Sequence, residues 1–312
     1  MIKKLPFLGF ISISLIRQPN ISQRYDIHNY WVDYKSETFG YTDTNGNILE
    51  FKDGINNTTT LFPCVKHLHN FQKNKHDYII NQYSEKFEKS RLITKQDEKQ
   101  FRWKDTTLSE TFFESTYYRS NYYGSTYIHN FTNNNVEVLE LEKKSNESYY
   151  QGQNWIDGVS ISVNDGNILC IHKYKNSSMK QVFQQKIIEN TILKKIKVFP
   201  VGDLYHILLH YKNDKIYLLS IKHVHKIENY QMVGLHKITD KKNVIDCDFQ
   251  YPFLVIMTLN QLEIYEVKSN VLIKKITTKN IPDLPYFTSM LFYKNWILFN
   301  GQSNILSFVY VV

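Results

Sequence analysis

The sequence predicts an all-β fold assembled from repeated hairpins. Three observations support this: the composition, the alternation of apolar and polar residues in short segments, and the even spacing of those segments. The 312 residues include no alanine, the best helix former, whereas tyrosine (23) and phenylalanine (19) are abundant. The hydrophobic content of 42% suffices for a large core, so a helical bundle is disfavoured and an extensively disordered chain is not expected.

Several segments alternate like a strand, turn at Asn, Asp or Gly, and alternate again. Two of these turns share four letters, Gly46–Leu49 and Gly166–Leu169, and the last hairpin repeats three of them from Asn304. Asn-Gly and Asp-Gly turns between alternating segments are a strong hairpin signal. The predicted hairpins span residues 38–51, 125–141, 159–172, 205–221, 253–267 and 296–310.

The hairpins recur with a period close to 43 residues. The interval of 88 residues between the first two hairpins holds two units, the second centred at Leu92. Seven units of this length predict a seven-bladed β-propeller, because blades repeat every 40–45 residues or so. The alternative is an all-β sandwich with regular hairpins. The period is marked by the first apolar residue after each turn, namely Ile48, Val136, Ile168, Ile216, Leu262 and Ile305.

Residues 1–312 are therefore expected to form a single propeller domain. Two regions depart from the period: the unit from Val136 to Ile168 has only 32 residues, which indicates tight loops or a missing outer strand, and a long loop is expected within 89–119. The last blade is one strand short at the C-terminus. We expect the spare strand Phe7–Ile16 to pair with this blade and close the ring.

The N-terminal run also resembles a signal peptide, because Lys3 and Lys4 precede the apolar residues. No small-residue cleavage site follows, which favours a strand but leaves the secretory route open. The three cysteines, Cys64, Cys170 and Cys247, are odd in number and widely spaced, so they predict reduced thiols and a nuclear or cytoplasmic protein.

One strand carries a family resemblance. Ile264-Tyr265-Glu266 followed by a turn at Asn270 resembles the end of the third strand in WD40 repeats, with Tyr in place of Trp and Glu in place of Asp; Val138–Leu141 is a weaker copy. The other units show neither Trp nor Asp there, and no Gly-His pair opens a blade. The chain is thus similar to a highly diverged WD40-like propeller. This resemblance implies a scaffold that holds protein partners and implies no catalytic residues.

The sequence indicates no catalytic, cofactor-binding or metal-binding residues. No GxSxG, HExxH, P-loop or GxGxxG motif occurs in a suitable context. Cys64, His67 and His69 are close in sequence, but the accompanying ligands of a zinc site are missing, so structural or exposed roles are expected. A propeller hydrolase remains the third hypothesis for function.

The aromatic segment 112–123 is the most unusual local feature. Tyrosine together with arginine is typical of interface anchors, and it can also stack on bases. The alternative is a core strand followed by a Tyr-rich loop. The candidate partner-binding residues are Phe112, Phe113, Tyr117, Tyr118, Arg119, Tyr122 and Tyr123.

The formal net charge of +8 comes from 38 Lys and Arg against 30 Asp and Glu, and only five of the cations are Arg. Clustered lysines suit phosphate contacts, but they also protect strand edges, and base-reading surfaces prefer Arg. The candidate phosphate-binding residues are Lys194, Lys195, Lys197, Lys241, Lys242, Lys274 and Lys275.

Together these features predict a non-enzymatic protein–protein interaction scaffold, a subunit of a nuclear or cytoplasmic multiprotein complex, with no cofactor, small-molecule substrate or membrane association. The alternative is an RNA- or DNA-associated propeller subunit that binds phosphates through the Lys clusters.

Binding to nucleic acid is predicted to be weak and non-specific. Because it would depend on lysine–phosphate contacts, affinity should fall steeply between about 50 and 200 mM salt as counterion release loses its advantage. Fluorescence anisotropy with labelled RNA and DNA measures this dependence. A tight, sequence-selective complex that survives raised salt would contradict the prediction.

Overall fold

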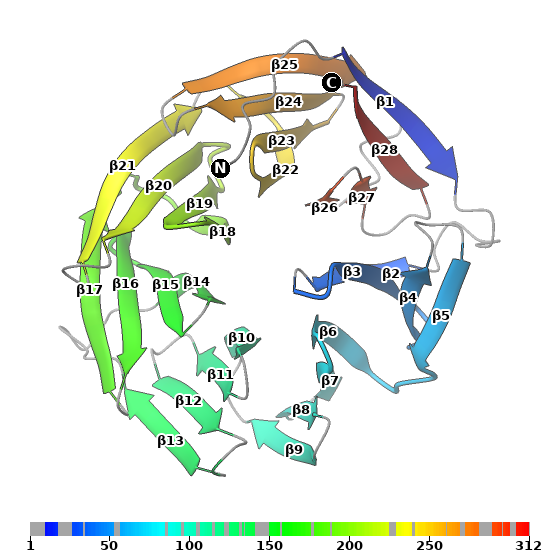
Figure 1. The fold of residues 1–312 in the computed structure, drawn as a ribbon, viewed down its shortest axis with the longest axis vertical. Helices are drawn as coiled ribbons and strands as arrows, with labels where there is room; N and C mark the ends of the chain where they lie inside the picture. The colour runs from blue at the N-terminus through cyan, green and yellow to red at the C-terminus, as the bar shows by residue number, and fades with distance from the viewer. Residues whose placement is uncertain are drawn as a thin grey trace. The chain divides into compact units, whose positions relative to one another are not determined.

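All regular secondary structure in the described part of the chain is β-strand. The strands form seven four-stranded antiparallel sheets (Figure 1). No described helix is long and apolar enough to cross a membrane. The computed structural model describes residues 10–17, 27–33, 35–52, 57–84, 87–94, 97–103, 107–113, 116–121, 125–130, 133, 135–140, 150–156, 158–175, 178–187, 189–224, 229–238, 241–259, 261–268, 272–280, 289–294, 296–299 and 304–311.

The chain divides into two compact units, and four of the sheets belong to the unit formed by Asp33–Glu37 and Lys66–Lys241. In each of them the strands lie side by side in chain order. The sheets are β6 (Leu68–Asn74), β7 (Asp77–Ser84), β8 (Phe87–Ile93) and β9 (Glu98–Trp103); β10 (Thr107–Phe113), β11 (Thr116–Asn121), β12 (Ser125–Asn130) and β13 (Asn135–Glu140); β14 (Tyr150–Ile156), β15 (Val159–Asn164), β16 (Ile168–Lys175) and β17 (Ser178–Lys186); and β18 (Leu193–Val201), β19 (Leu204–Tyr211), β20 (Ile216–Val224) and β21 (Asn229–Ile238).

The other unit, Met1–Val32 with Thr38–Val65 and Lys242–Val312, holds the remaining three sheets. Two of them again follow chain order, whereas the third combines the two ends of the chain. The sheets are β2 (Ile27–Asp33), β3 (Thr38–Asp43), β4 (Ile48–Lys52) and β5 (Asn57–Phe62); β22 (Val244–Gln250), β23 (Phe253–Thr258), β24 (Gln261–Lys268) and β25 (Leu272–Asn280); and β26 (Met290–Tyr293), β27 (Trp296–Phe299), β28 (Asn304–Val311) and β1 (Phe10–Arg17).

The N-terminal strand completes the last sheet. Phe10 pairs with Val311 and Arg17 with Asn304, in a continuous antiparallel register between β1 and β28. The expected pairing of the N-terminal strand with the C-terminal hairpin is therefore confirmed for residues 10–16. Residues 7–9 of the predicted strand lie outside the described residues.

The repeat is more regular than the sequence indicated. Third strands begin at residues 48, 87, 125, 168, 216, 261 and 304, at intervals of 38 to 48 residues. Assigning Val136 to a third strand was wrong, because β13, which contains it, is the fourth strand of its sheet and β12 is the third. The Asn-rich turn before Val136 resembles the turns that precede third strands in other sheets, but here it precedes the fourth strand. No outer strand is missing in this region.

The described residues within 89–119 contain no long loop, contrary to the expectation, since strands β8, β9, β10 and β11 occupy most of this region. Buried polar residues hid the strand pattern. Ser90 is fully buried and Glu110 is 7% exposed, so polar letters stand where a core strand would normally show apolar ones.

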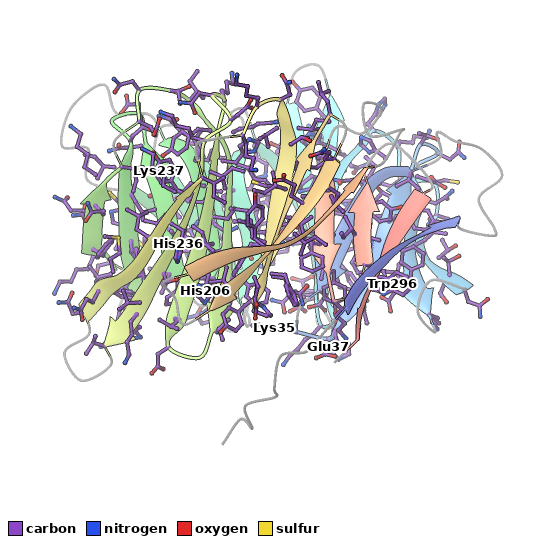
Figure 2. All side chains as sticks on the ribbon, turned by 90° about the horizontal axis from the view of Figure 1, so that it is seen from above. Lys35, Glu37, His206, His236, Lys237 and Trp296 are labelled. Carbon is purple, nitrogen blue, oxygen red and sulfur yellow. The ribbon has the colours of Figure 1, made fainter. Side chains whose placement is uncertain are left out.

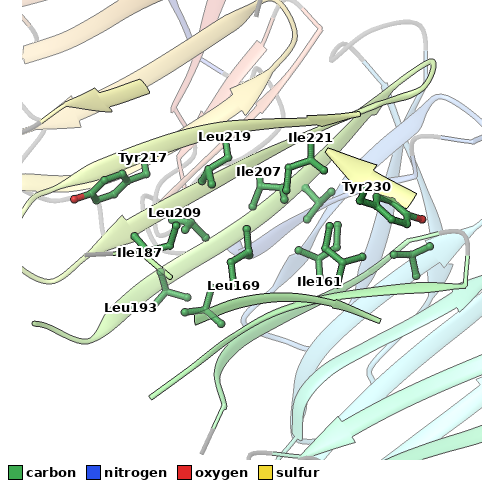
Figure 3. Packing of buried hydrophobic residues seen from close by; sticks show 14 of the residues in the cluster. Ile161, Leu169, Ile187, Leu193, Ile207, Leu209, Tyr217, Leu219, Ile221 and Tyr230 are labelled. Atoms are coloured by element: carbon green, nitrogen blue, oxygen red, sulfur yellow. The ribbon is translucent and has the colours of Figure 1, made fainter. Parts of the chain in front are cut away.

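Packing between neighbouring sheets forms the core. Figure 3 shows the cluster between the β14–β17 and β18–β21 sheets, where Ile161 and Leu169 face Ile207, Leu209 and their neighbours. Alternate residues of β19 enter this cluster because successive side chains of a strand point to opposite faces. Each fully buried Ile or Leu contributes about 1.5–3 kcal/mol to folding.

The shared turn letters have a shared structural role. Asn47 Oδ1 accepts a hydrogen bond from the backbone N–H of Cys64 at 3.0 Å, and Asn167 Nδ2 donates to the backbone oxygen of Glu189 at 2.6 Å. Both contacts tie the turn between the second and third strands to the segment that follows the fourth strand. The repeated Asn thus fixes the exit of the chain from its sheet.

Side chains of one sheet accept hydrogen bonds from backbone N–H groups at the edge of the next sheet. Between the sheets that begin with β22 and β26, the acceptors are alternate residues of β22, so they lie on one face of that strand. Each accepts a hydrogen bond from the backbone N–H of the residue 44 positions later. The first strand of a sheet has one edge without a strand partner, and these contacts occupy its N–H groups. The pairs are Asp246 Oδ2 with Met290 N (2.8 Å), Asp248 Oδ2 with Phe292 N (2.7 Å) and Gln250 Oε1 with Lys294 N (2.6 Å).

The other unit uses the same device at a spacing of 42 residues. Gln151 Oε1 of β14 accepts the N–H of Leu193 at 2.5 Å, and Asp33 Oδ2 accepts the N–H of Lys75 at 2.6 Å. We refer to all of these contacts as edge clamps.

A second polar contact joins the β14–β17 and β18–β21 sheets through Glu189. Its carboxylate accepts hydrogen bonds from Lys215 Nζ at 2.9 Å, Asn213 Nδ2 at 3.1 Å and the Tyr217 hydroxyl, and Lys237 Nζ lies at 3.5 Å. Burial alone would raise the pKa of Glu189, but these donors outweigh it and lower the pKa to about 2. The contact is therefore a buried anion that the fold needs in its ionised form.

Asp248→Ala is expected to lower the free energy of unfolding by about 1–3 kcal/mol, because it leaves the N–H groups of Phe249 and Phe292 without their acceptor in a buried site. Urea denaturation measures the change. Asp165→Ala, at an exposed turn position, is the matched control and should change stability little. Equal effects of both substitutions would contradict the role of the edge clamp.

Glu189→Gln is expected to weaken the fold at neutral pH and to flatten its acid dependence. A carboxyl whose pKa is lower in the folded state stabilises the protein above its ordinary pKa of 4.5 and loses that contribution as the pH falls toward about 2. Urea denaturation between pH 2 and 7 tests this, with Asp165→Asn as control. An unchanged pH profile in Glu189→Gln would show that the contact does not stabilise the fold.

Candidate functional site

A half-buried aromatic surface lies between β9, the outer strand of the β6–β9 sheet, and β12, the third strand of the β10–β13 sheet. Lys99, Phe101 and Trp103 alternate along β9 and therefore share one face, which packs against Tyr127 and His129 of β12. All but His129 are partly exposed. We call these five residues the β9 surface.

The rings of the β9 surface hold one another in fixed positions. Phe101 stacks on Trp103 with ring centroids 5.4 Å apart and an interplanar angle of 15°. Tyr127 meets both rings edge-on, at 5.5 Å from Phe101 and 5.0 Å from Trp103. Such arrangements add stabilisation beyond area burial. The surface is therefore formed in advance of any binding event.

A cation lies beside the rings. Lys99 Nζ is 3.1 Å from His129 Nε2. Burial lowers the pKa of His129, and the neighbouring Lys99 charge lowers it further. His129 is thus held neutral near pH 7, so its Nε2 can accept a hydrogen bond from the Lys99 ammonium group.

Beneath the rings is a buried ionic network. The guanidinium of Arg119 lies 4.2 Å from the centre of the Trp103 ring and 3.9 Å from the carboxylates of both Glu88 and Glu110. Glu110 also accepts hydrogen bonds from Tyr117 at 2.6 Å and Ser90 at 3.0 Å. Trp103 Nε1 donates to the same Ser90 hydroxyl at 2.9 Å, so the ring is tied to the network from below.

The network is suited to support rather than to acid–base chemistry. Burial raises the pKa of Glu110, although the hydrogen bonds from Tyr117 and Asn81 act in the opposite direction. The side chains of Glu88 and Glu110 are only 8% and 2% exposed. These carboxylates are thus enclosed, whereas the rings of Phe101 and Trp103 above them are partly exposed.

The predicted partner-binding residues do not form one exposed group among the residues that the structure describes. Tyr117, Tyr118 and Arg119 are buried, with exposed fractions of 0%, 4% and 4%. Tyr117 and Arg119 lie against Phe101 and Trp103 of the β9 surface, whereas Tyr118 is on the opposite face of β11. Tyr118 stacks on Trp155 at 4.5 Å within the core. Phe112 and Phe113 lie in β10, where they pair with Tyr117 and Thr116. Their side chains, like Tyr122 and Tyr123, are outside the described residues.

Sequence reasoning missed Phe101, Trp103, Tyr127, Lys99 and His129. The available signal was the alternation from Glu98 to Trp103, in which Glu, Gln and Arg occupy one set of alternate positions and Lys, Phe and Trp occupy the other. It fell inside the segment assigned to a loop.

The predicted phosphate-binding lysines occupy different strand positions. Lys194, Lys195 and Lys197 lie on β18, the first strand of its sheet. Lys241 and Lys242 precede β22, and Lys274 and Lys275 lie on β25, a fourth strand, with side chains outside the described residues. The lysines thus do not follow one strand position around the repeat, and their role stays a prediction.

The histidines that share strand faces are largely internal. Figure 2 labels His206 of β19 and His236 of β21. His206 contacts the Ser220 hydroxyl at 2.9 Å, and burial, with a smaller effect of His236, lowers the pKa of His206 to about 4. His69 differs, because its side chain is 61% exposed beside Glu88. Cys64, which follows β5, and His67, in the turn before β6, have positive φ angles of 51° and 54°.

No protein-family model matches the chain, and no curated protein matches it. Solved structures do. The Cps50 (Swd1) β-propeller domain of Myceliophteria thermophila aligns with a TM-score of 0.63 at 10% identity, covering 94% of this chain and 100% of that one. A chain of the mitotic checkpoint complex aligns at 0.62 and 12% (96% and 95%), and YCF48 bound to a D1 peptide at 0.58 and 11% (95% and 94%). The chain is therefore a β-propeller that resembles WD40 propellers.

Proposed function

We propose that this protein is a non-enzymatic scaffold, a subunit of a nuclear or cytoplasmic multiprotein complex, which holds a protein partner on the β9 surface. The observation that carries the proposal is the partly exposed cluster of Phe101, Trp103 and Tyr127 with Lys99 beside it and Arg119 beneath it. Trp, Tyr and Arg dominate the binding energy of protein interfaces.

The rigidity of the surface supports this proposal. A ring that is already stacked and hydrogen-bonded loses little side-chain entropy when a partner covers it. Trp103 meets this condition through Ser90, Phe101 and Arg119.

The structural neighbours agree with a binding role. One belongs to the mitotic checkpoint complex, and another, YCF48, was solved with a bound peptide. In the scaffold we propose, the seven sheets are the blades of one ring, and β1 closes it by completing the last blade. The pairing of β1 with β28 supports this closure.

Purification of the tagged protein from its own cells tests the proposal. Lys99→Glu places a negative charge on the β9 surface, so a partner that contacts this surface should be recovered at least about tenfold less than with the unaltered chain. Lys180→Glu makes the same charge change at an exposed position of β17, another fourth strand, and should leave recovery unchanged.

The two variants should have equal melting temperatures, so that a loss of partner cannot be due to unfolding. If the folded Lys99→Glu variant recovers the same proteins in the same amounts as Lys180→Glu, the β9 surface is not the partner site.

A further inference from the structure

A chain of hydrogen bonds connects the β9 surface to a buried carboxylate. Trp103 Nε1 donates to the Ser90 hydroxyl at 2.9 Å, and this hydroxyl donates to Glu110 Oε1 at 3.0 Å. An indole N–H can only donate and an ionised carboxylate can only accept, so the direction of both hydrogen bonds is fixed. The position of the Trp103 ring therefore depends on Glu110 as an acceptor.

Glu110 fills this role best in its ionised form. Besides Ser90, Tyr117 donates to Oε1 at 2.6 Å and Asn81 Nδ2 donates to Oε2. Three donors thus converge on the two oxygens of one carboxylate. Protonation would add a further donor at this place, which weakens the hydrogen bonds already made there.

A second Trp–Ser pair in the same unit lacks the charge. Trp155 Nε1 of β14 donates to the Ser120 hydroxyl of β11 at 3.1 Å, and Ser120 contacts the Thr126 hydroxyl at 3.0 Å. The first two members of this chain are the same, but it ends on a group that stays neutral at all working pH values. Trp155 is therefore an internal control for any effect of the carboxylate on Trp103.

We propose that Ser90 and Glu110 are positioning residues of the partner site, and that the proton on Glu110 regulates it. Ionised Glu110 holds Trp103 through Ser90, and protonation weakens this hold and lowers the affinity for the partner. The inference rests on the proposed function, which it deepens by naming a regulator of the same surface. The partner is then bound at neutral pH and released in acid.

The surroundings of Glu110 bring its protonation closer to neutral pH. Burial raises the pKa of Glu110, hydrogen bonds from Tyr117 and Asn81 lower it in part, and the charge of Glu88 raises it further. The net shift is upward from the ordinary value of 4.5. Glu110 therefore takes up its proton at a higher pH than an exposed glutamate does.

Other ionisable groups lie near this network. Arg119 Nε is 3.9 Å from Glu110 Oε1 and keeps its charge throughout, and His69 Nδ1 is 4.0 Å from Glu88 Oε1. On the other side of β10, strand β14 carries no Asp, Glu, Lys, Arg or His. His69, and His129 within the β9 surface, are the groups whose titration has to be separated from that of Glu110.

Indole N–H signals in NMR spectra of the full chain give the first test, because each of the four tryptophans contributes one signal. From the ordinary glutamate pKa of 4.5 up to about pH 8, the Trp103 signal should follow a single one-proton transition. The Trp155 signal should show no such transition. Trp103→Phe and Trp155→Phe assign the two signals.

Ser90→Ala removes the link and leaves Glu110, His69 and His129 in place, so the transition of the Trp103 signal should disappear. Ser120→Ala is the matched control, because it removes the corresponding hydroxyl beside Trp155 and should leave that transition unchanged. Glu110→Gln is neutral at every pH and should hold the Trp103 signal at its acid position. If Glu110→Gln does not fold, the unaltered chain and Ser90→Ala still decide the question.

Partner recovery with the tagged protein gives the second test. Recovery should be at least about fivefold lower below the Trp103 transition than above it, because a hydrogen bond that positions the ring is lost. Ser90→Ala should show the low recovery on both sides of the transition, at a melting temperature that shows it to be folded.

Three results would overturn the inference: a Trp103 signal that does not titrate, a transition that persists in Ser90→Ala, or equal partner recovery on both sides of the transition. If Lys99→Glu loses the partner while the Trp103 signal does not titrate, the scaffold function stands and only its regulation fails. If the Trp103 signal titrates but Lys99→Glu recovers as much partner as Lys180→Glu, the proposed function fails, and the regulation of a partner site fails with it.

Discussion

The structure depends on one constraint: the first strand of each sheet exposes backbone N–H groups that no strand of its own sheet can satisfy. A buried N–H without an acceptor is costly, so an acceptor must come from elsewhere. In the edge clamps it comes from the preceding sheet, as when Asp248 receives the N–H of Phe292. A side-chain carboxylate or amide can accept this hydrogen bond while the backbone of its own strand stays paired with the second strand of its sheet.

The same constraint explains the repeat length. Clamps join residues 42 or 44 positions apart, which is one four-stranded sheet with its turns. If a sheet had one strand more or one strand fewer, its acceptor side chain would no longer lie next to the first strand of the following sheet. The apolar clusters, such as that around Ile207 and Leu209, then fill the space that the clamps define.

Charge is used in two ways in the unit that holds the β9 surface. Glu189, Glu110 and Arg119 are buried and surrounded by hydrogen-bond partners, so they fix neighbouring sheets in one arrangement. Arg102 of β9 and Lys89 of β8, by contrast, are exposed or partly exposed and lie directly opposite each other in register. The aromatic rings of Phe101 and Trp103 separate the buried charges from this outer strand edge.

The sequence alone determined the all-β class, the seven-fold repeat and the N-terminal strand, because alternation and turn residues such as Gly46-Asn47 are local properties of the chain. It predicted the hairpin that holds β12 and β13 but gave Val136 the wrong strand position, because the Asn-rich turn before β13 resembles the turns that precede third strands elsewhere. It did not identify the β9 surface. Whether Tyr117 is core and Phe101 surface depends on which sheets become neighbours, and Ser90 and Glu110 can be buried only because partners distant in sequence satisfy them. These choices are made by tertiary packing, where burial and hydrogen bonding are decided together.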